Sequence, residues 1–194
     1  MSYADTAFQK AVFLDKDGTL IKDVPYNIDP ALVVFEQGVF DGLRSLQDCG
    51  YKLIIISNQP GISLGYFSEC ELSNLIHYFE EKFVENNVLL SGFYYCPHLP
   101  EKSHSACRCR KPRPGMIMQA AQDLAIDLKS SWMIGDILND VEAGNRAGCQ
   151  TILIDNGNET EWVSGLYREP DYITRNFPDA AYITSRTVIK DGKQ

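Results

Sequence analysis

The sequence predicts an α/β fold in which a parallel sheet carries helices on both faces. Three observations lead to this prediction. Short apolar runs alternate along the chain with longer segments of helical periodicity, the pattern of parallel sheets. Several of these runs end in acidic or hydroxyl side chains. The 194 residues, 44% hydrophobic and 23% charged, suit one soluble globular domain. We expect a single domain over 1–194, with its core in about 10–155.

Five short apolar runs have the length and composition of buried strands. They are 11–15 (AVFLD), 52–57 (KLIIIS), 92–96 (GFYYC), 131–136 (SWMIGD) and 150–155 (QTILID). The segments between them have helical spacing. They are 39–50, 68–83, 114–126 and about 139–147. Beyond Asn156 the pattern weakens, and we expect only a closing strand or helix there.

The limits of the helices follow from residues that favour helix ends. Gly50 suits the position just after a helix C-terminus. Ser68 followed by Glu71 is a capping box, and Pro114 is tolerated in a first turn. The apolar residues of the second helix fall on one face, namely Leu72, Leu75, Ile76, Phe79 and Phe83.

Composition excludes several classes of function. The formal charge of −8 argues against nucleic acid or an anionic membrane as the main partner. No apolar stretch approaches the roughly 20 residues that span a bilayer. The N-terminus, MSYADTAFQK, lacks the features of an export signal. We therefore expect a cytoplasmic protein, a monomer, whose six cysteines are thiols or metal ligands rather than disulfides.

Polar side chains gather where the predicted strands end. Asp15 and Asp17 end the first strand, the tripeptide 57–59 (SNQ) ends the second, and Asp136 ends the fourth. In a parallel sheet these ends meet at one edge, where ligands bind. Oxygen ligands without cysteine or histidine favour Mg²⁺. Asp140, one helical turn after Asp136, has two open roles: metal contact, or orientation and capping.

The motif Asp-x-Asp-Gly also occurs in calcium loops and in solvated turns. An EF-hand loop requires glycine at position six and glutamate at position twelve. Counted from Asp15, these positions hold Leu20 and Tyr26, which excludes that loop. A solvated turn remains an alternative interpretation of this motif when it is taken alone. It does not explain the presence of four motifs in order along the chain.

A second metal site is predicted between the third strand and the third helix. Cys96-x-His98 and Cys107-x-Cys109 form a Cys₃His set, which is typical of structural zinc. A metal would fold this loop (about 96–109), which has almost no apolar residues. The alternatives are a cluster of reduced thiols, and His104 as the imidazole ligand. The remaining cysteines are expected to be small apolar fillers, namely Cys49, Cys70 and Cys149. His77, on the polar flank of a helix, needs no role.

A basic run follows the second pair of cysteines. Four of the 18 cationic residues lie within six positions, namely Arg108, Arg110, Lys111 and Arg113. A solvated loop and an anion site are both open, and the adjacent metal loop favours the anion site because it would hold these charges in place.

Four motifs together resemble those of the haloacid dehalogenase superfamily of phosphotransferases. They are DKDGTL (15–20), SNQ (57–59), Lys111 in CRKP, and GDILND (135–140). The resemblance implies that Asp15 attacks phosphorus to form an aspartyl-phosphate. It implies that Asp17 protonates the leaving oxygen and then activates the hydrolytic water.

The same resemblance assigns the charge-stabilising groups. It implies Mg²⁺ bound by Asp15, Asp136 and the backbone carbonyl of Asp17. Ser57 and the amide of Asn58 would bind the phosphoryl oxygens, and Lys111 would neutralise their charge.

The metal loop narrows the resemblance. FLDKDGTLI, SNQPGI, GYF, YYCPH and CRCRKPRPGM are similar to segments of the heptose 1,7-bisphosphate phosphatases and of the related histidinol-phosphate phosphatases. In that group the loop replaces a large cap domain on a Rossmann-like core. Substrate contacts would come from Asp23 to Tyr26, from Ser57 to Pro60 including Gln59, and from Arg110 on a distal group. A heptose bisphosphatase would remove the 7-phosphate in surface-polysaccharide precursor synthesis.

Two positions depart from the heptose-enzyme pattern. Ile137 stands where those enzymes generally have lysine, and Leu64 where they have arginine. Neither position touches the predicted catalytic groups. The sequence therefore predicts a phosphatase of a small phosphorylated metabolite. The heptose 1,7-bisphosphate is the favoured substrate, and histidinol phosphate or another sugar phosphate is the alternative. A non-catalytic metal-binding module is the alternative from another class.

Overall fold

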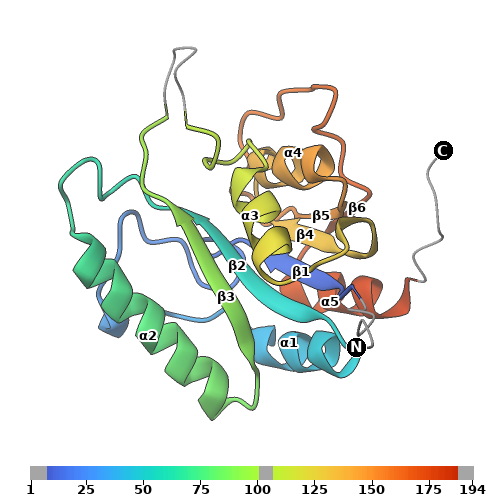
Figure 1. Cartoon of the computed structure of the whole chain (residues 1–194), viewed down its shortest axis with the longest axis horizontal. Coiled ribbons are helices and arrows are strands. Elements are labelled where there is room, and N and C mark those ends of the chain that lie inside the picture. Colours follow the sequence, from blue (N-terminus) through green and yellow to red (C-terminus); the bar gives the residue numbers. More distant parts are fainter. Residues whose placement is uncertain (1–7, 101–106, 188–194) are drawn as a thin grey trace, which may run out of the picture.

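The computed structural model describes residues 8–100 and 107–187, and the six strands of these residues form one sheet (Figure 1). The strands are β1 (Ala11–Leu14), β2 (Lys52–Asn58), β3 (Leu90–Cys96), β4 (Trp132–Gly135), β5 (Gln150–Ile154) and β6 (Tyr172–Thr174). Their order is β3-β2-β1-β4-β5-β6, and every neighbouring pair is parallel. The predicted α/β class is confirmed.

Helices cover both faces of the sheet (Figure 1). They are α1 (Val39–Asp48), α2 (Glu69–Glu85), α3 (Gly115–Asp123), α4 (Leu138–Ala147) and α5 (Phe177–Arg186), with short 3₁₀ turns at Pro30–Leu32 and Leu128–Ser130. Successive strand residues point to opposite faces. Val12 and Leu14 of β1 pack with α1, α2 and α5, whereas Ala11 and Phe13 pack with α3 and α4. The central strand is therefore buried on both sides.

Three details differ from the sequence-based expectation. The third helix ends at Asp123 rather than at 126, because Ala125 adopts a positive φ of 51° that no α-helix continues. The tail forms both β6 and α5 instead of a single closing element. Cys70 is exposed, so its assignment as an apolar filler is wrong. It lies in the first turn of α2, two residues before the buried Leu72 and therefore on the opposite side of the helix.

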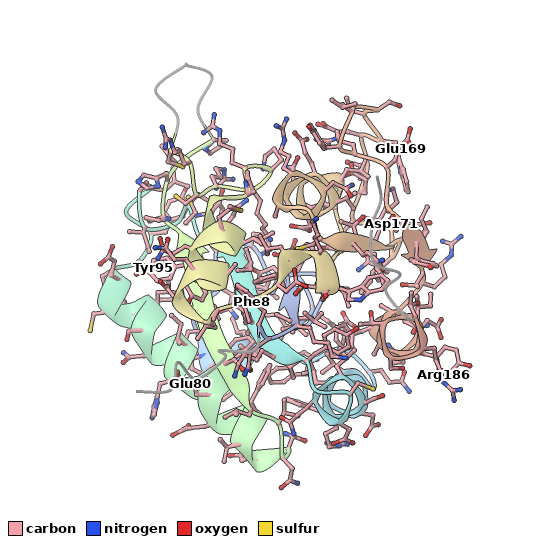
Figure 2. The ribbon with its side chains drawn as sticks, turned by 45° about the vertical axis from the view of Figure 1, so that its right-hand side comes forward. Phe8, Glu80, Tyr95, Glu169, Asp171 and Arg186 are labelled. Atoms are coloured by element: carbon pink, nitrogen blue, oxygen red, sulfur yellow. The ribbon has the colours of Figure 1, made fainter. Side chains whose placement is uncertain are left out.

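The connection between β5 and β6 runs over the outside of the molecule. Figure 2 labels Glu169 and Asp171 near the end of this connection, and it shows Glu80 on α2 and Arg186 at the end of α5. Across residues 8–100 and 107–187, no helix is both long enough and apolar enough to cross a membrane.

Candidate functional site

A pocket of about 410 Å³ lies beyond the carboxyl ends of the central strands. Ten of the residues predicted for catalysis, substrate or magnesium line it, namely Asp15, Asp17, Asp23, Tyr26, Ser57, Asn58, Gln59, Arg110, Lys111 and Asp136. Val24, inside the predicted range Asp23 to Tyr26, is not among the lining residues. Parallel topology brings many of these residues together, because the carboxyl ends of β1, β2 and β4 and the loops that follow them meet at one edge of the sheet.

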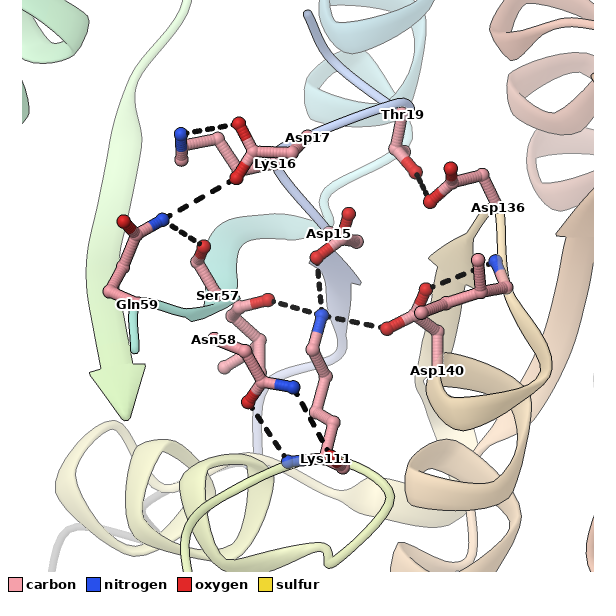
Figure 3. Close-up of polar contacts among 12 residues, drawn as sticks. Asp15, Lys16, Asp17, Thr19, Ser57, Asn58, Gln59, Lys111, Asp136 and Asp140 are labelled. Atoms are coloured by element: carbon pink, nitrogen blue, oxygen red, sulfur yellow. Dashed lines mark hydrogen bonds and ion pairs between the residues drawn. The ribbon is translucent and has the colours of Figure 1, made fainter. Parts of the chain in front are cut away.

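Lys111 is the buried cation at the centre of this site (Figure 3). Its ammonium group bonds to Asp15, pairs with Asp140 Oδ1 at 2.7 Å and donates to the carbonyl of Ile56 at 2.8 Å. Burial by itself lowers the pKa of Lys111, but the charges of Asp140 and Asp15 raise it above its ordinary value. Lys111 is therefore a fixed positive charge beside Asp15.

The side chain of Asn58 holds the backbone of Lys111. Its amide nitrogen donates to the Lys111 carbonyl at 3.2 Å, and its oxygen accepts from the Lys111 amide at 3.1 Å (Figure 3). This pair of hydrogen bonds joins the end of β2 to the basic run. The side chain of Asn58 is thus occupied by Lys111, and a contact of its backbone amide with a phosphoryl group stays a prediction.

Asp17 has a different environment from Asp15. Its Oδ1 accepts from the ammonium of the buried Lys16 at 2.6 Å, and its Oδ2 lies 3.4 Å from Gln59 Nε2. Gln59 also donates to Ser57 Oγ at 2.8 Å, so one chain of polar groups connects Asp17 to Ser57. Burial raises the pKa of Asp17, and Lys16 opposes the shift. A carboxyl group that can hold a proton is what general acid catalysis requires.

Asp136 is oriented by two neutral donors. Thr19 Oγ1 donates to its Oδ1 at 3.2 Å, and Asn158 Nδ2 donates to its Oδ2 at 2.7 Å. Gly18, with φ +81°, lets the loop after β1 pass close by, since a Cβ there would lie 2.1 Å from Asp136 Oδ2. Burial, with the charge of Asp15 in addition, raises the pKa of Asp136 to about 8.

The carboxylates fit a divalent cation. One oxygen from each of Asp15, Asp136 and Asp140 lies within 4.8 Å of the others. Burial raises the pKa of Asp15 to about 6, so the group of acids is poorly compensated without a cation. The oxygen donors match the preference of Mg²⁺. Asp140 already pairs with Lys111 and accepts from the backbone amide of Ile137 at 3.3 Å, which favours the orienting and capping role over direct metal contact.

The four donor residues of the metal loop lie close enough together to bind one tetrahedral ion. Single donor atoms from Cys96, His98, Cys107 and Cys109 lie within 4.8 Å of one another. His98 Nδ1 lies 3.4 Å from the sulfur of Cys96 and 3.3 Å from that of Cys109, and the sulfur–sulfur distances from Cys96 are 3.1 and 3.6 Å. Ligands of one tetrahedral zinc ion lie about 3.6–3.8 Å apart. The alternative ligand, His104, lies outside the described residues.

The cations of the basic run have separate roles. The guanidinium group of Arg113 donates to the carbonyl of Cys107 and so links the basic run to the metal loop. Arg110 lines the pocket and donates to the carbonyl of His98 at 3.0 Å. In the described part of the chain Arg110 pairs with no carboxylate, unlike Lys16 and Lys111. It is therefore the pocket cation that is available to a distal anion.

Of the two residues that depart from the heptose-enzyme pattern, Ile137 lies at the pocket and Leu64 does not. Ile137 lines the pocket, so an apolar side chain stands there in place of the lysine of the heptose enzymes. Leu64 is partly exposed and is not among the lining residues.

Sequence reasoning missed several residues of the site. Lys16, Thr19 and Asn158 contact the predicted acids, and Asn156 donates to the carbonyl of Gly18 at 2.7 Å. Lys16 and Thr19 belong to the first motif, so their closeness to the predicted acids could have been inferred from the sequence. Asn156 and Asn158 lie where the strand–helix pattern fades, and no local signal marks them.

Comparison with protein-family models gives a match to the HAD-hydrolase-like family over residues 108–180. Among curated proteins, the chain is 44% identical over 154 residues to the D-glycero-beta-D-manno-heptose-1,7-bisphosphate 7-phosphatase of Haemophilus ducreyi, covering 77% of this chain and 85% of that protein. It is 37% identical over 166 residues to the enzyme of the same name from Escherichia coli, covering 79% and 87%.

Comparison with solved structures also finds phosphatases. The D,D-heptose 1,7-bisphosphate phosphatase of B. bronchiseptica, solved with magnesium and phosphate, superimposes with a TM-score of 0.78 at 26% identity. The match covers 89% of this chain and 96% of that one. A HAD-like phosphatase from Mesorhizobium loti gives a TM-score of 0.77 at 27% identity, covering 96% and 90%.

Proposed function

Because the chain belongs to the family of the D-glycero-beta-D-manno-heptose-1,7-bisphosphate 7-phosphatases, we propose that it hydrolyses the 7-phosphate of this sugar bisphosphate. The reaction is that of a magnesium-dependent phosphoric monoester hydrolase. The observation that carries the proposal is the convergence of Asp15, Asp17, Lys111 and Asp136 on one pocket.

Asp15 is the proposed nucleophile. Lys111 holds one of its carboxylate oxygens, and the other attacks phosphorus as the bond from phosphorus to the sugar oxygen breaks. Asp17 gives its proton to that oxygen, and the heptose 1-phosphate leaves. Water then attacks the aspartyl-phosphate and loses a proton to Asp17. Inorganic phosphate departs and Asp15 is regenerated.

The charge on the transferred group is met by fixed groups of the chain. Lys111 and Ser57, with the backbone amide of Asn58, are the proposed donors to the phosphoryl oxygens. Asp15, Asp136 and the backbone carbonyl of Asp17 are the proposed ligands of Mg²⁺, which when bound offsets the repulsion between nucleophile and phosphate. The zinc ligands would fix the loop that carries Lys111 and Arg110.

Arg110 is the proposed contact of the 1-phosphate. Its guanidinium group lacks a carboxylate partner in the described residues, and a bidentate contact with phosphate is its preferred geometry. Asp23, Tyr26 and Gln59 complete the proposed substrate contacts. Ile137, which lines the pocket, provides no positive charge for a second phosphate. A monophosphate such as histidinol phosphate is therefore the alternative substrate.

Steady-state kinetics with Mg²⁺ tests the proposal. The heptose bisphosphate, the corresponding 1-phosphate and histidinol phosphate are compared as substrates, with Asp15→Asn as the inactive control. We expect preference for the bisphosphate and loss of turnover in the variant. Preference for histidinol phosphate would overturn the substrate, and absence of turnover on every phosphate ester would favour the non-catalytic module. Cytoplasmic location and a monomeric state stay predictions.

A further inference from the structure

Among the described residues, five side-chain amides line the pocket, and four of them donate hydrogen bonds to atoms of the chain itself. These four are Asn27, Asn58, Gln59 and Asn158. The fifth is Asn139, the second residue of α4. In the part of the chain that the structure describes, the amide nitrogen of Asn139 donates to no protein atom, whereas its oxygen is bonded. A few polar groups of this kind fix the orientation of a ligand in a pocket.

The oxygen of the Asn139 side chain is held by a residue outside the pocket. Arg168, on the connection between β5 and β6, donates through Nη1 to Asn139 Oδ1 at 3.1 Å. A guanidinium group has donors and no acceptor, so the oxygen of the side-chain amide must face it. Arg168 is not a lining residue. The NH₂ group of Asn139 is therefore the end of the side chain that remains for the pocket.

A carboxylate fixes Arg168 in this position. The same Nη1 lies 3.0 Å from Oε2 of Glu142, one turn further along α4, and the side chain of Arg168 is only 17% exposed. The other oxygen of Glu142 pairs with Arg146 at 2.8 Å. Arg168 is thus held against α4 and keeps the side-chain amide of Asn139 in one orientation. Orientation that exists before the substrate arrives reduces the entropic cost of binding.

We propose that Asn139, positioned by Arg168, is a specificity-determining residue that donates a hydrogen bond to a hydroxyl group of a sugar phosphate. This inference rests on the proposed function, since it takes the pocket as the site of phosphate-ester hydrolysis. The cations Lys111 and Arg110 suit the charged phosphates, whereas a neutral NH₂ group suits a neutral acceptor. A site built to bond a hydroxyl group discriminates against substrates that lack it, because its own donor is then left unpaired.

Two substrates, one with and one without hydroxyl groups, test the inference. The heptose bisphosphate carries several hydroxyl groups, and acetyl phosphate carries none. The measured quantity is the ratio of kcat/KM for the heptose bisphosphate to kcat/KM for acetyl phosphate. Asn139→Leu removes the donor and keeps a branched side chain, and it should lower this ratio by about three- to tenfold. The loss should appear as a higher KM for the sugar substrate at an unchanged kcat, because the contact exists in the ground state and in the transition state alike.

Variants of Arg168 test its positioning role. Arg168→Met releases the oxygen of Asn139 and should lower the same ratio by about threefold. When Arg168→Met is combined with Asn139→Leu, the ratio should equal that of Asn139→Leu alone, because Arg168 acts through Asn139. Arg146→Met is the matched control and should leave the ratio unchanged. Arg146 pairs with the same Glu142, whereas the contact with Asn139 comes from Arg168.

The outcomes separate this inference from the proposed function. An unchanged ratio in Asn139→Leu, or an equal loss on both substrates, would overturn the inference and leave the proposed function in place. An additive loss in the double variant would overturn the positioning role of Arg168. If the wild type hydrolyses acetyl phosphate but not the heptose bisphosphate, the proposed substrate fails by itself. The same variants are then compared on the sugar monophosphate with the highest kcat/KM, where an unchanged ratio again overturns the role of Asn139.

Discussion

The side-chain amide of Asn158 donates to Oδ2 of Asp136 across 2.7 Å and so joins two loops that are 22 residues apart. The hydroxyl of Thr19 binds the other oxygen of Asp136 at 3.2 Å. Neutral donors orient a carboxylate while leaving its negative charge intact for a cation. Partners of this kind around metal ligands typically contribute a factor of about 10–100 to metal affinity.

Asn158→Ala should therefore weaken magnesium binding by about tenfold. Mg²⁺ titrations by calorimetry, and the dependence of Tm on Mg²⁺ concentration, measure the effect apart from activity. Asn145→Ala is the matched control. Asn145 anchors the same connection through the carbonyls of Tyr167 and Glu169 but does not contact Asp136. Equal magnesium affinity in the two variants would show that Asn158 does not position Asp136.

Loss of Asp140 should destabilise the fold as well as the site. Asp140→Ala leaves the buried Lys111 with one carboxylate and removes the cap of α4 at Ile137. Breaking a buried ion pair typically costs about 3–5 kcal/mol of unfolding free energy. Urea denaturation measures it. Asp41→Ala, which breaks an exposed pair with Arg44, should cost under about 1 kcal/mol. Similar costs for the two variants would contradict a structural role for the buried pair.

Zinc should bind in a one-to-one ratio and stabilise the loop before Lys111. Cys109→Ser is expected to lose the metal and to lower Tm, because metal binding supplies folding free energy to such loops. Metal analysis and a thermal scan give the two readouts. Cys70→Ser is the control, since Cys70 is exposed and lies on α2, away from the donor set. Retention of one zinc per chain in Cys109→Ser would refute the ligand assignment.

Magnesium-free protein should lose stability as the pH rises. Burial raises the pKa of Asp15 to about 6 and that of Asp136 to about 8, from an ordinary value of 3.8. Both groups bind protons more tightly in the folded chain than in the unfolded one. Their contribution is therefore fully present below pH 3.8 and is lost as the pH rises through 6 and 8.

Urea denaturation across this pH range checks the sign. Without Mg²⁺ the unfolding free energy should fall between about pH 5 and pH 9, and added Mg²⁺ should raise it more at the upper end, where the cation need not displace protons. Dialysis is preferable to a chelator, which would also remove zinc. A free energy that rises with pH in the absence of Mg²⁺ would contradict the assigned shifts.

The sequence by itself determined the layered fold and most of the site. Strand–helix alternation implies parallel topology, and parallel topology gathers the residues at the carboxyl end of each strand or just after it, such as Asp15, Ser57 and Asp136. The Cys₃His cluster, a candidate zinc site, was readable from its spacing, since both pairs stand in one loop. These inferences need only patterns within short segments of the sequence, together with the rule that the carboxyl ends of parallel strands meet at one edge of the sheet.

Only the tertiary structure decided which partner each of these residues meets. Lys111 lies between Asp15 and Asp140, Asn158 reaches Asp136, and Tyr66 meets Tyr26. These contacts join loops, and loop conformation depends on turn geometry and on the loops nearby more than on periodicity. The positive φ of Tyr26 is the clearest case, because the residue type argues against the conformation that its surroundings hold.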